Sequence, residues 1–453
     1  MGTETNVSAA VIIDTSNSMT YSGYVDITKI DSKAFLGCFV EGDRAAVVNY
    51  DMYAHVPYAC KEVGPVPPGT TIVDAQTTIQ NLVFTGGATN IGAGLSTGNA
   101  QIQNQPNNRA LVLLSDGYNN YPYGSNPLDY VPTTYPVYSC AMGPASDQRL
   151  MQNIANKSDN GAYYYAPYVI DMMKIYNQIR SWTPEASLVT NELSQVSGWY
   201  YKLEPGEITA GTPMGQFTVA WSDASYTYTH DWPNDKQVSI TLVDPDLNTR
   251  DDIPWQVGTG FVVFNINDPL PGTWQVQVMY AGEADLGITV GIFEYGMGVT
   301  APLRMEVGAP PTVRAGEPIP IAAFVTDGGE PIRDLQVHMR VTRPRISVAH
   351  ALRQYATELA DVRPADEDLA RGMPEDLARL CELRRRRLPG KEILPLVQHG
   401  GFLAQESSTG PYATTITNTT EAGSYVIEVF AKGHSARSGR RVQRTQMVTV
   451  LVV

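Results

Sequence analysis

Oxygen-bearing side chains follow an apolar run near the start of the chain. The run Val11-Ile-Ile-Asp14 ends in an aspartate, and Ser16 and Ser18 follow at alternate positions. An apolar run that ends in hard oxygen donors is typical of a buried strand that carries ligands to its carboxyl end, where open α/β sheets bind them. This stretch therefore predicts one half of a divalent-cation site.

Two later stretches could supply the other half. Asp116 follows the apolar run Ala110–Ser115, and Thr89 lies in a loop whose glycines, Gly86 and Gly87, allow backbone conformations that other residues avoid. The carboxyl ends of neighbouring parallel strands lie at one edge of a sheet, so we expect both aspartates there, with the loop folded over them. The predicted ligands are Asp14, Ser16, Ser18, Thr89 and Asp116.

Two carboxylates and three hydroxyls form an all-oxygen set. Such a set suits a hard ion such as Mg²⁺, with Mn²⁺ or Ca²⁺ as alternatives, and is poor for zinc. Hydroxyls bound directly, with the aspartates acting through water, would leave the ion under-neutralised. An acidic side chain of a partner protein would then complete the coordination.

Side chains suited to partner contact surround the predicted site. Tyrosine and asparagine lose little side-chain entropy on binding, and the alternative is an ordinary polar loop. The candidate contact residues are Asn17, Asn90, Tyr118, Asn119 and Tyr121.

Strand-like and helical patterns alternate from Ser8 to Trp182, which predicts a Rossmann-like α/β domain at residues 1–185 with a mostly parallel sheet and helices on both faces. The predicted strands are Ala9–Asp14, Ala45–Tyr50, Ala110–Ser115, Val137–Met142 and Ala162–Tyr165, with His55–Tyr58 as an antiparallel edge strand. The predicted helices lie near Ile27–Phe39, Ile72–Leu82, Ile91–Gln103, Gln148–Asn156 and Val169–Trp182.

The pattern changes after Trp182. Short strand-like runs separated by turn signals such as Pro205-Gly206 and Pro271-Gly272 predict a β-sandwich at residues 190–302. Residues 303–453 predict a second, immunoglobulin-like sandwich. A helical hairpin is expected to interrupt it at residues 346–392, with Ser347 as a helix cap and Pro374 in the first turn of the second helix.

Composition limits the function classes. The 453 residues predict two to four domains, and 32 basic against 46 acidic residues, a formal charge of -14, argue against a nucleic-acid groove or an anionic-lipid surface. No apolar run is long enough to span a bilayer. The four cysteines lack C-x-x-C spacing, and a Cys38–Cys60 disulfide is not favoured. The compartment stays open: extracellular or cell surface for a mature or trimmed chain, cytoplasmic if Met1 is the native start.

The sequence gives weak support to a catalytic or nucleotide-binding function. The Gly86-Gly87 loop lacks the spacing of a phosphate-binding loop, and no histidine pairs with a recognisable nucleophile elbow. Asp14 as a phosphatase-type nucleophile would need a second acid two residues later, where Ser16 stands. A phosphotransfer enzyme is therefore a weak alternative.

Three motifs resemble the metal-ion-dependent adhesion site of von Willebrand factor A domains. In chain order they are Asp14-x-Ser16-x-Ser18, Thr89 in the glycine loop, and Asp116 in Leu113-Leu-Ser-Asp-Gly117. The resemblance covers residues 8–182. It implies that Ser16, Ser18 and Thr89 are direct or conformation-dependent ligands and that the aspartates act mostly through water. Many relatives read Gly-Gly-Thr-Asn where this chain reads Gly87-Ala88-Thr89-Asn90, and the extra alanine could shift the loop.

The later part is similar to the tail of calcium-activated chloride channel regulators, where a β-sandwich and a fibronectin-like module follow such a domain. Asp244-Pro-Asp246 followed by Gly272-Thr-Trp274 carries this resemblance. The metalloprotease part of those proteins has no counterpart, because no His-Glu-x-x-His occurs.

The leading hypothesis is a non-enzymatic adhesion or assembly protein whose metal site captures an acidic residue of a protein partner, carried on a stalk of two β-sandwiches. One alternative is a structural scaffold subunit with a constitutive metal. A weaker one is a metal-dependent hydrolase. The sequence predicts no oligomeric state.

Overall fold

The structure is a computed structural model. It describes residues 6–64, 70–106, 108–121, 126–183, 186–251, 254–296, 303–366, 369, 373–386, 397–406 and 411–453. Three units follow one another along the chain, at residues 6–183, 186–296 and 303–453, and the predicted boundaries near 185 and 302 fall on residues outside the described ranges.

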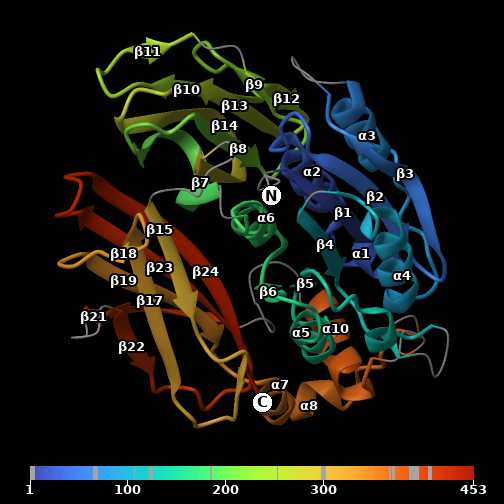
Figure 1. Ribbon diagram of the computed structural model, residues 1–453. Coiled ribbons are helices and arrows are strands. Elements are labelled where there is room, and N and C mark those ends of the chain that lie inside the picture. Colours follow the sequence, from blue (N-terminus) through green and yellow to red (C-terminus); the bar gives the residue numbers. More distant parts are fainter. Residues whose placement is uncertain are drawn as a thin grey trace.

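The first unit contains a six-stranded sheet in the order β3-β2-β1-β4-β5-β6 (Figure 1). Its strands are β1 (Val7–Asp14), β2 (Arg44–Tyr50), β3 (Ala54–Glu62), β4 (Asn108–Ser115), β5 (Val137–Met142) and β6 (Ala162–Ala166). All neighbours are parallel except β2 and β3. Every residue of β1 is buried, as expected for a strand covered on both faces. The predicted strands and the antiparallel edge strand are confirmed.

Helices cover both faces of this sheet. They are α1 (Asn17–Tyr21), α2 (Val25–Gly37), α3 (Thr70–Gln80), α4 (Ile91–Ile102), α5 (Gln148–Lys157) and α6 (Met172–Arg180), with the short 3₁₀ helices η1 (Pro127–Tyr130) and η2 (Val169–Asp171). Helix α2 contacts α3 and α6 on one face, whereas α4 and α5 both contact η1 on the other. The five predicted helices are present within a few residues of their expected ends, and α1 is an additional short helix.

The second unit is one eight-stranded sheet. Its strands are β7 (Ala186–Ile208), β8 (Met214–Trp221), β9 (Thr227–Thr229), β10 (Gln237–Val243), β11 (Thr249–Arg250), β12 (Gln256–Gly258), β13 (Phe261–Asn267) and β14 (Gly272–Tyr295). Strand β14 pairs with β7 along its length, and with β10 and then β8 along its other edge. The sandwich predicted for this region is therefore not confirmed, because hydrogen bonds through β14 connect all the strands.

The third unit contains two five-stranded sheets around one apolar core. One sheet has β15 (Leu303–Gly308), β17 (Ile319–Asp327), β18 (Glu330–Pro331), β21 (Gln405–Glu406) and β22 (Tyr412–Ile416). The other has β16 (Thr312–Val313), β19 (Gln336–Pro344), β20 (Val397–Leu403), β23 (Gly423–His434) and β24 (Arg441–Val452). Two sheets on a shared core agree with a sandwich, while the immunoglobulin-like assignment stays a prediction.

A helical insertion separates β19 from β20. It contains α7 (Val348–Gln354), α8 (Ala356–Leu359) and α10 (Glu375–Arg386). Ser347 caps α7 by accepting a hydrogen bond from the backbone N–H of His350, as predicted. The predicted first helix is divided at Tyr355, and the predicted end of the insertion, residues 387–392, lies outside the described ranges.

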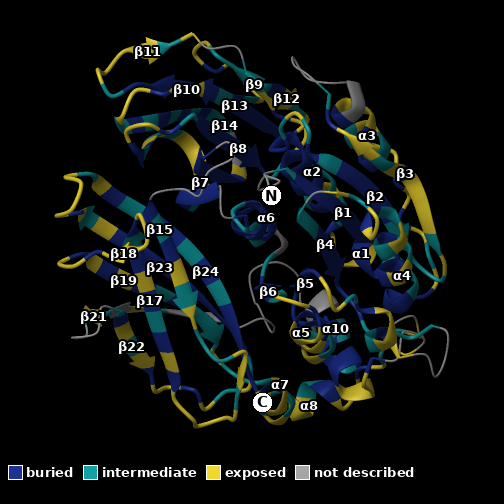
Figure 2. Ribbon diagram, in the orientation of Figure 1, coloured by how far each residue is buried: buried dark blue, intermediate teal, exposed yellow. Residues whose placement is uncertain are grey.

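The three units pack against one another (Figures 1 and 2). The core of the first unit includes Phe261 and Val263 of the second unit and Val426 and Met447 of the third. Figure 2 shows buried residues continuing across these contacts. The expected stalk is therefore wrong, since both β-rich units lie against the first unit.

Candidate metal centre

Asp14 ends β1, and the pairing of Ile13 with Leu114 of β4 places it beside Ser115. The Ser115 hydroxyl donates a 2.8 Å hydrogen bond to Asp14 Oδ2, and the backbone N–H of Ser16 donates a 2.9 Å bond to Asp14 Oδ1. The Asp14 carboxylate is fully buried. Parallel pairing thus brings it to the edge of the sheet where β4 ends, as predicted.

A row of hydroxyls connects Ser16 to the second aspartate. The Ser16 and Ser18 Oγ atoms are 2.8 Å apart, and Ser18 Oγ donates a 2.6 Å hydrogen bond to Asp116 Oδ1. Ser22, one helical turn after Ser18, donates a 3.2 Å bond to Asp116 Oδ2. Ser22 is exposed, so the site meets solvent at α1. The sequence motif did not identify Ser22, although its i+4 spacing from Ser18 is the available signal.

The glycine loop folds over the same edge. Gly86 pairs with Ser16 as an isolated β-bridge, and its carbonyl accepts a 2.8 Å hydrogen bond from the backbone N–H of Asn17. A Cβ atom on Gly117 would lie 3.6 Å from Thr89 Oγ1 and 3.8 Å from Ser18 Oγ, so both hydroxyls border Gly117. The extra alanine, Ala88, therefore does not remove Thr89 from the cluster.

Thr89 Oγ1 is buried, and the part of the chain that the structure describes offers it no hydrogen-bond partner. Buried polar atoms are nearly always paired with protein, water or an ion. An orphaned hydroxyl beside two carboxylates is what a site for a hard cation would provide. Among the described residues no cluster of three or more His, Cys, Asp or Glu side chains could hold a metal, so an ion here would rely on the hydroxyls.

Two asparagines after Asp116 hold the glycine loop. Asn119 Oδ1 accepts a 2.9 Å hydrogen bond from the Ile91 N–H, and Asn120 Oδ1 accepts a 2.8 Å bond from the Thr89 N–H. The Asn120 N–H donates in return to the Thr89 carbonyl at 3.0 Å. Asn119 stays a predicted contact residue, and its amide oxygen also positions the loop.

Asn90 was also predicted to contact a partner, and in the structure its side chain bonds within the glycine loop and its surroundings. Its Oδ1 accepts a 3.0 Å hydrogen bond from the Ala93 N–H, which caps α4, and its Nδ2 donates to the Met52 carbonyl at 3.2 Å. The side chain is buried because these two bonds hold it inside the loop. Asn17 is half-buried beside the site and remains a candidate.

The tyrosines near the site lie in two places: Tyr118 lies against the helical insertion, and Tyr121 lies beside Tyr53. Tyr118 packs against the apolar cluster of the helical insertion, and burial, with Asp147 and Cys381 nearby, raises its pKa to about 12. Tyr121 makes a T-shaped ring contact with Tyr53 at 6.2 Å. Tyr53 and Tyr21 are 59% and 56% exposed, and no sequence pattern pointed to either.

Tyr50 lies beneath the site. Its hydroxyl donates a 2.9 Å hydrogen bond to the Leu114 carbonyl. Burial raises the pKa of Tyr50 well above its ordinary value, and the negative charge of Asp14 acts in the same direction. The phenol therefore stays neutral, and it is a structural support.

Residues 10–178 match the family model of the von Willebrand factor type A domain. The first unit is therefore a von Willebrand factor type A domain, a kind of domain that generally mediates protein–protein interaction and adhesion. The match ends before the second and third units. A comparison with curated proteins finds no significant match.

Two solved structures that match part of this chain come from a mussel and a bacterium. Proximal thread matrix protein 1 of the mussel byssus is 17% identical, with 43% of this chain and 50% of that chain covered and a TM-score of 0.34. A von Willebrand factor type A protein of Catenulispora acidiphila is 14% identical, with 72% and 63% covered and a TM-score of 0.35. The chain thus spans about half of the mussel protein and less than two thirds of the bacterial one.

Proposed function

We propose that this chain is a non-enzymatic, divalent-cation-dependent protein-binding protein. The observation that supports this best is the cluster of five oxygen-bearing side chains, none more than 6% exposed, in which the Thr89 hydroxyl lacks a partner among the described residues. All five predicted ligands contribute to it. Mg²⁺ or Mn²⁺ suits their oxygen chemistry.

The proposed binding step uses the charge of the ion. Ser16, Ser18 and Thr89 would contact it directly, while Asp14 and Asp116 would act mostly through water. The bound cation would keep positive charge to attract an aspartate or glutamate of the partner. The residues of this chain hold the ion and orient the partner's carboxylate.

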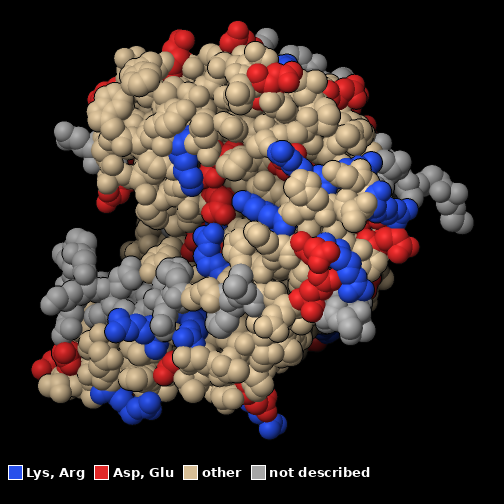
Figure 3. Space-filling view, turned by 90° about the vertical axis from the view of Figure 1, so that its left-hand side faces the viewer, with Lys and Arg blue, Asp and Glu red and all other residues tan. Residues whose placement is uncertain are grey.

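The partner would approach from the side of Tyr21, Tyr53 and Tyr121, since the helical insertion already covers Tyr118. Exposed tyrosines provide contact area at low entropic cost. Figure 3 presents the side of the molecule that lies on the left in Figure 1, and there basic and acidic side chains lie among one another and form no continuous basic surface. Among the described residues no helix is long and apolar enough to cross a membrane. With a formal charge of -14, this chain fits a protein partner better than a nucleic acid.

The second candidate is a scaffold with a constitutive metal. The burial of the donors and the packing of both β-rich units against the first unit favour it. In that case the ion would stabilise the fold, and partner binding would not depend on it. A metal-dependent hydrolase remains a third, weaker proposal.

Metal binding is tested first, by calorimetric titration of the chelator-treated protein with Mn²⁺. We expect one site, lost in Asp14→Ala and in Ser16→Ala/Ser18→Ala, and retained in the control Asp74→Ala, which changes an exposed aspartate of α3. Absence of binding by the folded wild-type protein would contradict the proposal.

Partner capture is tested second. Binding that needs Mg²⁺ and is lost in Asp14→Ala, with Asp74→Ala as control, supports capture through the ion. Capture that is unaffected by chelator favours the scaffold. Metal-dependent turnover of phosphoesters, abolished by Asp116→Ala, would support the hydrolase.

A further inference from the structure

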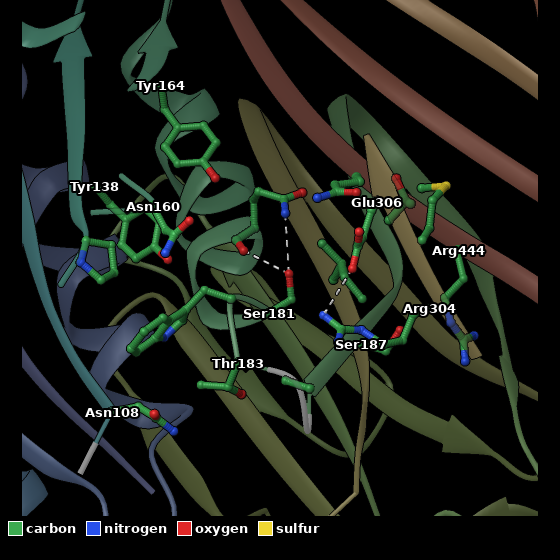
Figure 4. A pocket seen from close by; sticks show the side chains of 18 residues that line it. Asn108, Tyr138, Asn160, Tyr164, Ser181, Thr183, Ser187, Arg304, Glu306 and Arg444 are labelled. Atoms are coloured by element: carbon green, nitrogen blue, oxygen red, sulfur yellow. Dashed lines mark hydrogen bonds and ion pairs between the residues drawn. The ribbon is translucent and has the colours of Figure 1, made fainter. Parts of the chain in front are cut away.

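A cavity of about 420 Å³ lies at the edge of the first unit's sheet opposite the metal centre, where the three units meet (Figure 4). Asn108, Pro136 and Asn160 line it from the amino ends of β4, β5 and β6, whereas the metal cluster lies at carboxyl ends. The remaining walls come from the end of α6 and from β7, β15 and β24. Binding pockets often lie between domains and have volumes of roughly 300–1,000 Å³.

Polar side chains from more than one unit line this cavity. Tyr164, which is 5% exposed, lines it from β6. Gln446 lines it from β24, and its buried Oε1 atom has no hydrogen-bond partner among the described residues. Figure 4 shows the Tyr164 hydroxyl and the Asn160 amide directed toward the same space. Since buried polar groups are nearly always hydrogen-bonded, the Gln446 oxygen indicates an occupant that donates hydrogen bonds, and the Tyr164 phenol and the Asn160 amide can both donate and accept them.

Aromatic rings form another wall. Tyr138 and Trp182 both line the cavity and contact each other in a T-shaped arrangement with ring centroids 5.8 Å apart. Aromatic faces pack well against C–H groups, while amides and phenols bind hydroxyl groups. This combination matches a ligand with an apolar face and a rim of hydroxyls.

The charged side chains in the lining are already paired. Arg444 forms an ion pair with Glu294 and donates to the carbonyls of Leu303 at 3.1 Å and Gln443 at 2.7 Å. Arg304 lies 3.9 Å from Glu306. An anionic ligand would have to compete with these contacts, so the lining favours a neutral ligand.

We propose that this cavity binds a neutral carbohydrate of one or two sugar rings. The ring would pack against Trp182 and Tyr138, and its hydroxyls would bind Tyr164, Asn160 and Gln446. All three units line the cavity, so the sugar would also stabilise their packing by binding the folded state. The site is separate from the metal centre, and it does not depend on metal binding.

The test titrates the full chain, in chelator, with glucose, galactose, mannose, N-acetylglucosamine, maltose and cellobiose, each up to about 10 mM, a range that detects millimolar affinity. Binding is measured by saturation-transfer NMR and by tryptophan fluorescence. We expect at least one sugar to bind and to raise the melting temperature.

Two variants locate the binding. Tyr164→Phe removes only the hydroxyl and should weaken binding by about two- to tenfold with the fold unchanged. Trp182→Ala should abolish it. Tyr201→Phe, which changes a tyrosine that is 60% exposed on β7, is the matched control and should bind as wild type.

Three outcomes would overturn the proposal: no sugar binds the folded protein, a sugar binds both cavity variants as well as wild type, or a short neutral peptide displaces the sugar and binds more tightly. The chelator keeps these outcomes independent of the metal centre.

Discussion

Thr89 has a buried hydroxyl that no other described group satisfies. Thr89→Val keeps the shape of the side chain and removes this hydroxyl. Without metal the variant should be more stable than wild type by about 1 kcal/mol, because an unpaired buried polar group costs free energy. With metal it should bind Mn²⁺ at least about tenfold more weakly, because a ligand is lost. Urea unfolding in chelator and calorimetric titration measure the two effects.

The matched control is Thr89→Ser, which keeps the hydroxyl and should bind Mn²⁺ nearly as wild type does. Unchanged Mn²⁺ affinity in Thr89→Val would remove Thr89 from the ligand set. Opposite effects of one substitution on stability and on affinity are hard to explain by a general disturbance of the loop.

Asp31 of α2 is a second buried polar residue, 4% exposed, with Oδ2 unpartnered among the described residues. Burial raises its pKa well above 3.8. A raised folded-state pKa means that the native protein binds more protons than the unfolded chain, so stability falls as pH rises from about 3.8 through the folded-state pKa. Asp31→Asn should therefore match wild type near pH 4 and exceed it at pH 8 in urea unfolding. Equal stability at both pH values would contradict this.

The grouping of the five candidate ligands could be predicted because each belongs to a short local spacing that follows a strand or occupies a glycine loop. Ser115, Ser22 and Asn120 were not identified as site residues. Ser115 is an ordinary strand end in the sequence, and its bond to Asp14 depends on the pairing of β1 with β4. The contact set was less predictable, because burial decides whether an asparagine contacts a partner or caps a helix.

At the scale of elements, the segment from Ser115 to Asn120 connects the metal cluster to the rest of the molecule. Ser115 and Asp116 bond to Asp14 and Ser18, and Asn119 and Asn120 hold the glycine loop. Tyr118, between them, packs against the apolar cluster of the insertion. The insertion therefore supports the segment that carries one of the two aspartates.

Excising the insertion tests this support. Strands β19 and β20 pair up to Pro344 and Val397, so a two-residue Asn-Gly turn can replace residues 345–396. The third unit should still fold, because its core contains none of the insertion residues that the structure describes. Mn²⁺ affinity should fall by about two- to thirtyfold, the range expected when a contact in a coupled network is removed. Calorimetry measures the affinity, and circular dichroism checks the fold.

Tyr118→Ala in the full chain should reproduce part of this loss, whereas Tyr118→Phe, which keeps the ring contact, should not. Full Mn²⁺ affinity after excision, in a protein that is still folded, would show that the insertion does not support the site.

The alternation of strands and helices in the first unit was predictable, since local periodicity determines it. The long strands β7 and β14 could not be predicted from local patterns. Pro205 and Gly206 are typical of a turn, yet both lie inside β7, where they pair with Gln275 and Trp274. A 24-residue partner strand on one side supplies enough hydrogen bonds to override a local turn preference.

At the scale of the whole molecule, four charged side chains connect the three units. Lys174 of α6 forms an ion pair with Glu428 of β23. Arg340 of β19 lies 3.6 Å from Glu428 and 3.4 Å from Glu192 of β7. These contacts could not be predicted from the sequence, because two of them join residues from different units, the third joins two separate strands of the third unit, and no local pattern records such pairs. The same reason explains the wrong prediction of a stalk.

Glu428→Gln tests this network. Lys174 and Glu428 side chains are only 8% and 10% exposed, so the substitution leaves a buried lysine without its charged partner. Loss of a buried partner typically costs about 3–5 kcal/mol. Burial, followed by the nearby charge of Arg340, lowers the pKa of Lys174 to about 8. A lowered folded-state pKa means that the native protein loses this proton first, so stability rises with pH through the folded-state value.

The free energy of unfolding that Glu428→Gln loses should therefore be largest below pH 8 and should shrink toward pH 10. At the higher pH Lys174 is neutral, so the missing carboxylate no longer leaves a buried charge unpaired. Calorimetric unfolding at several pH values measures this loss of stability. We expect wild type to unfold in one transition and the variant in two, because the third unit of the variant is held less firmly against the other units. Glu375→Gln, which breaks the exposed Arg379–Glu375 pair of α10, is the control and should cost about 0.5 kcal/mol or less. A deficit that does not change with pH would assign the loss to packing, with the charge of Lys174 uninvolved.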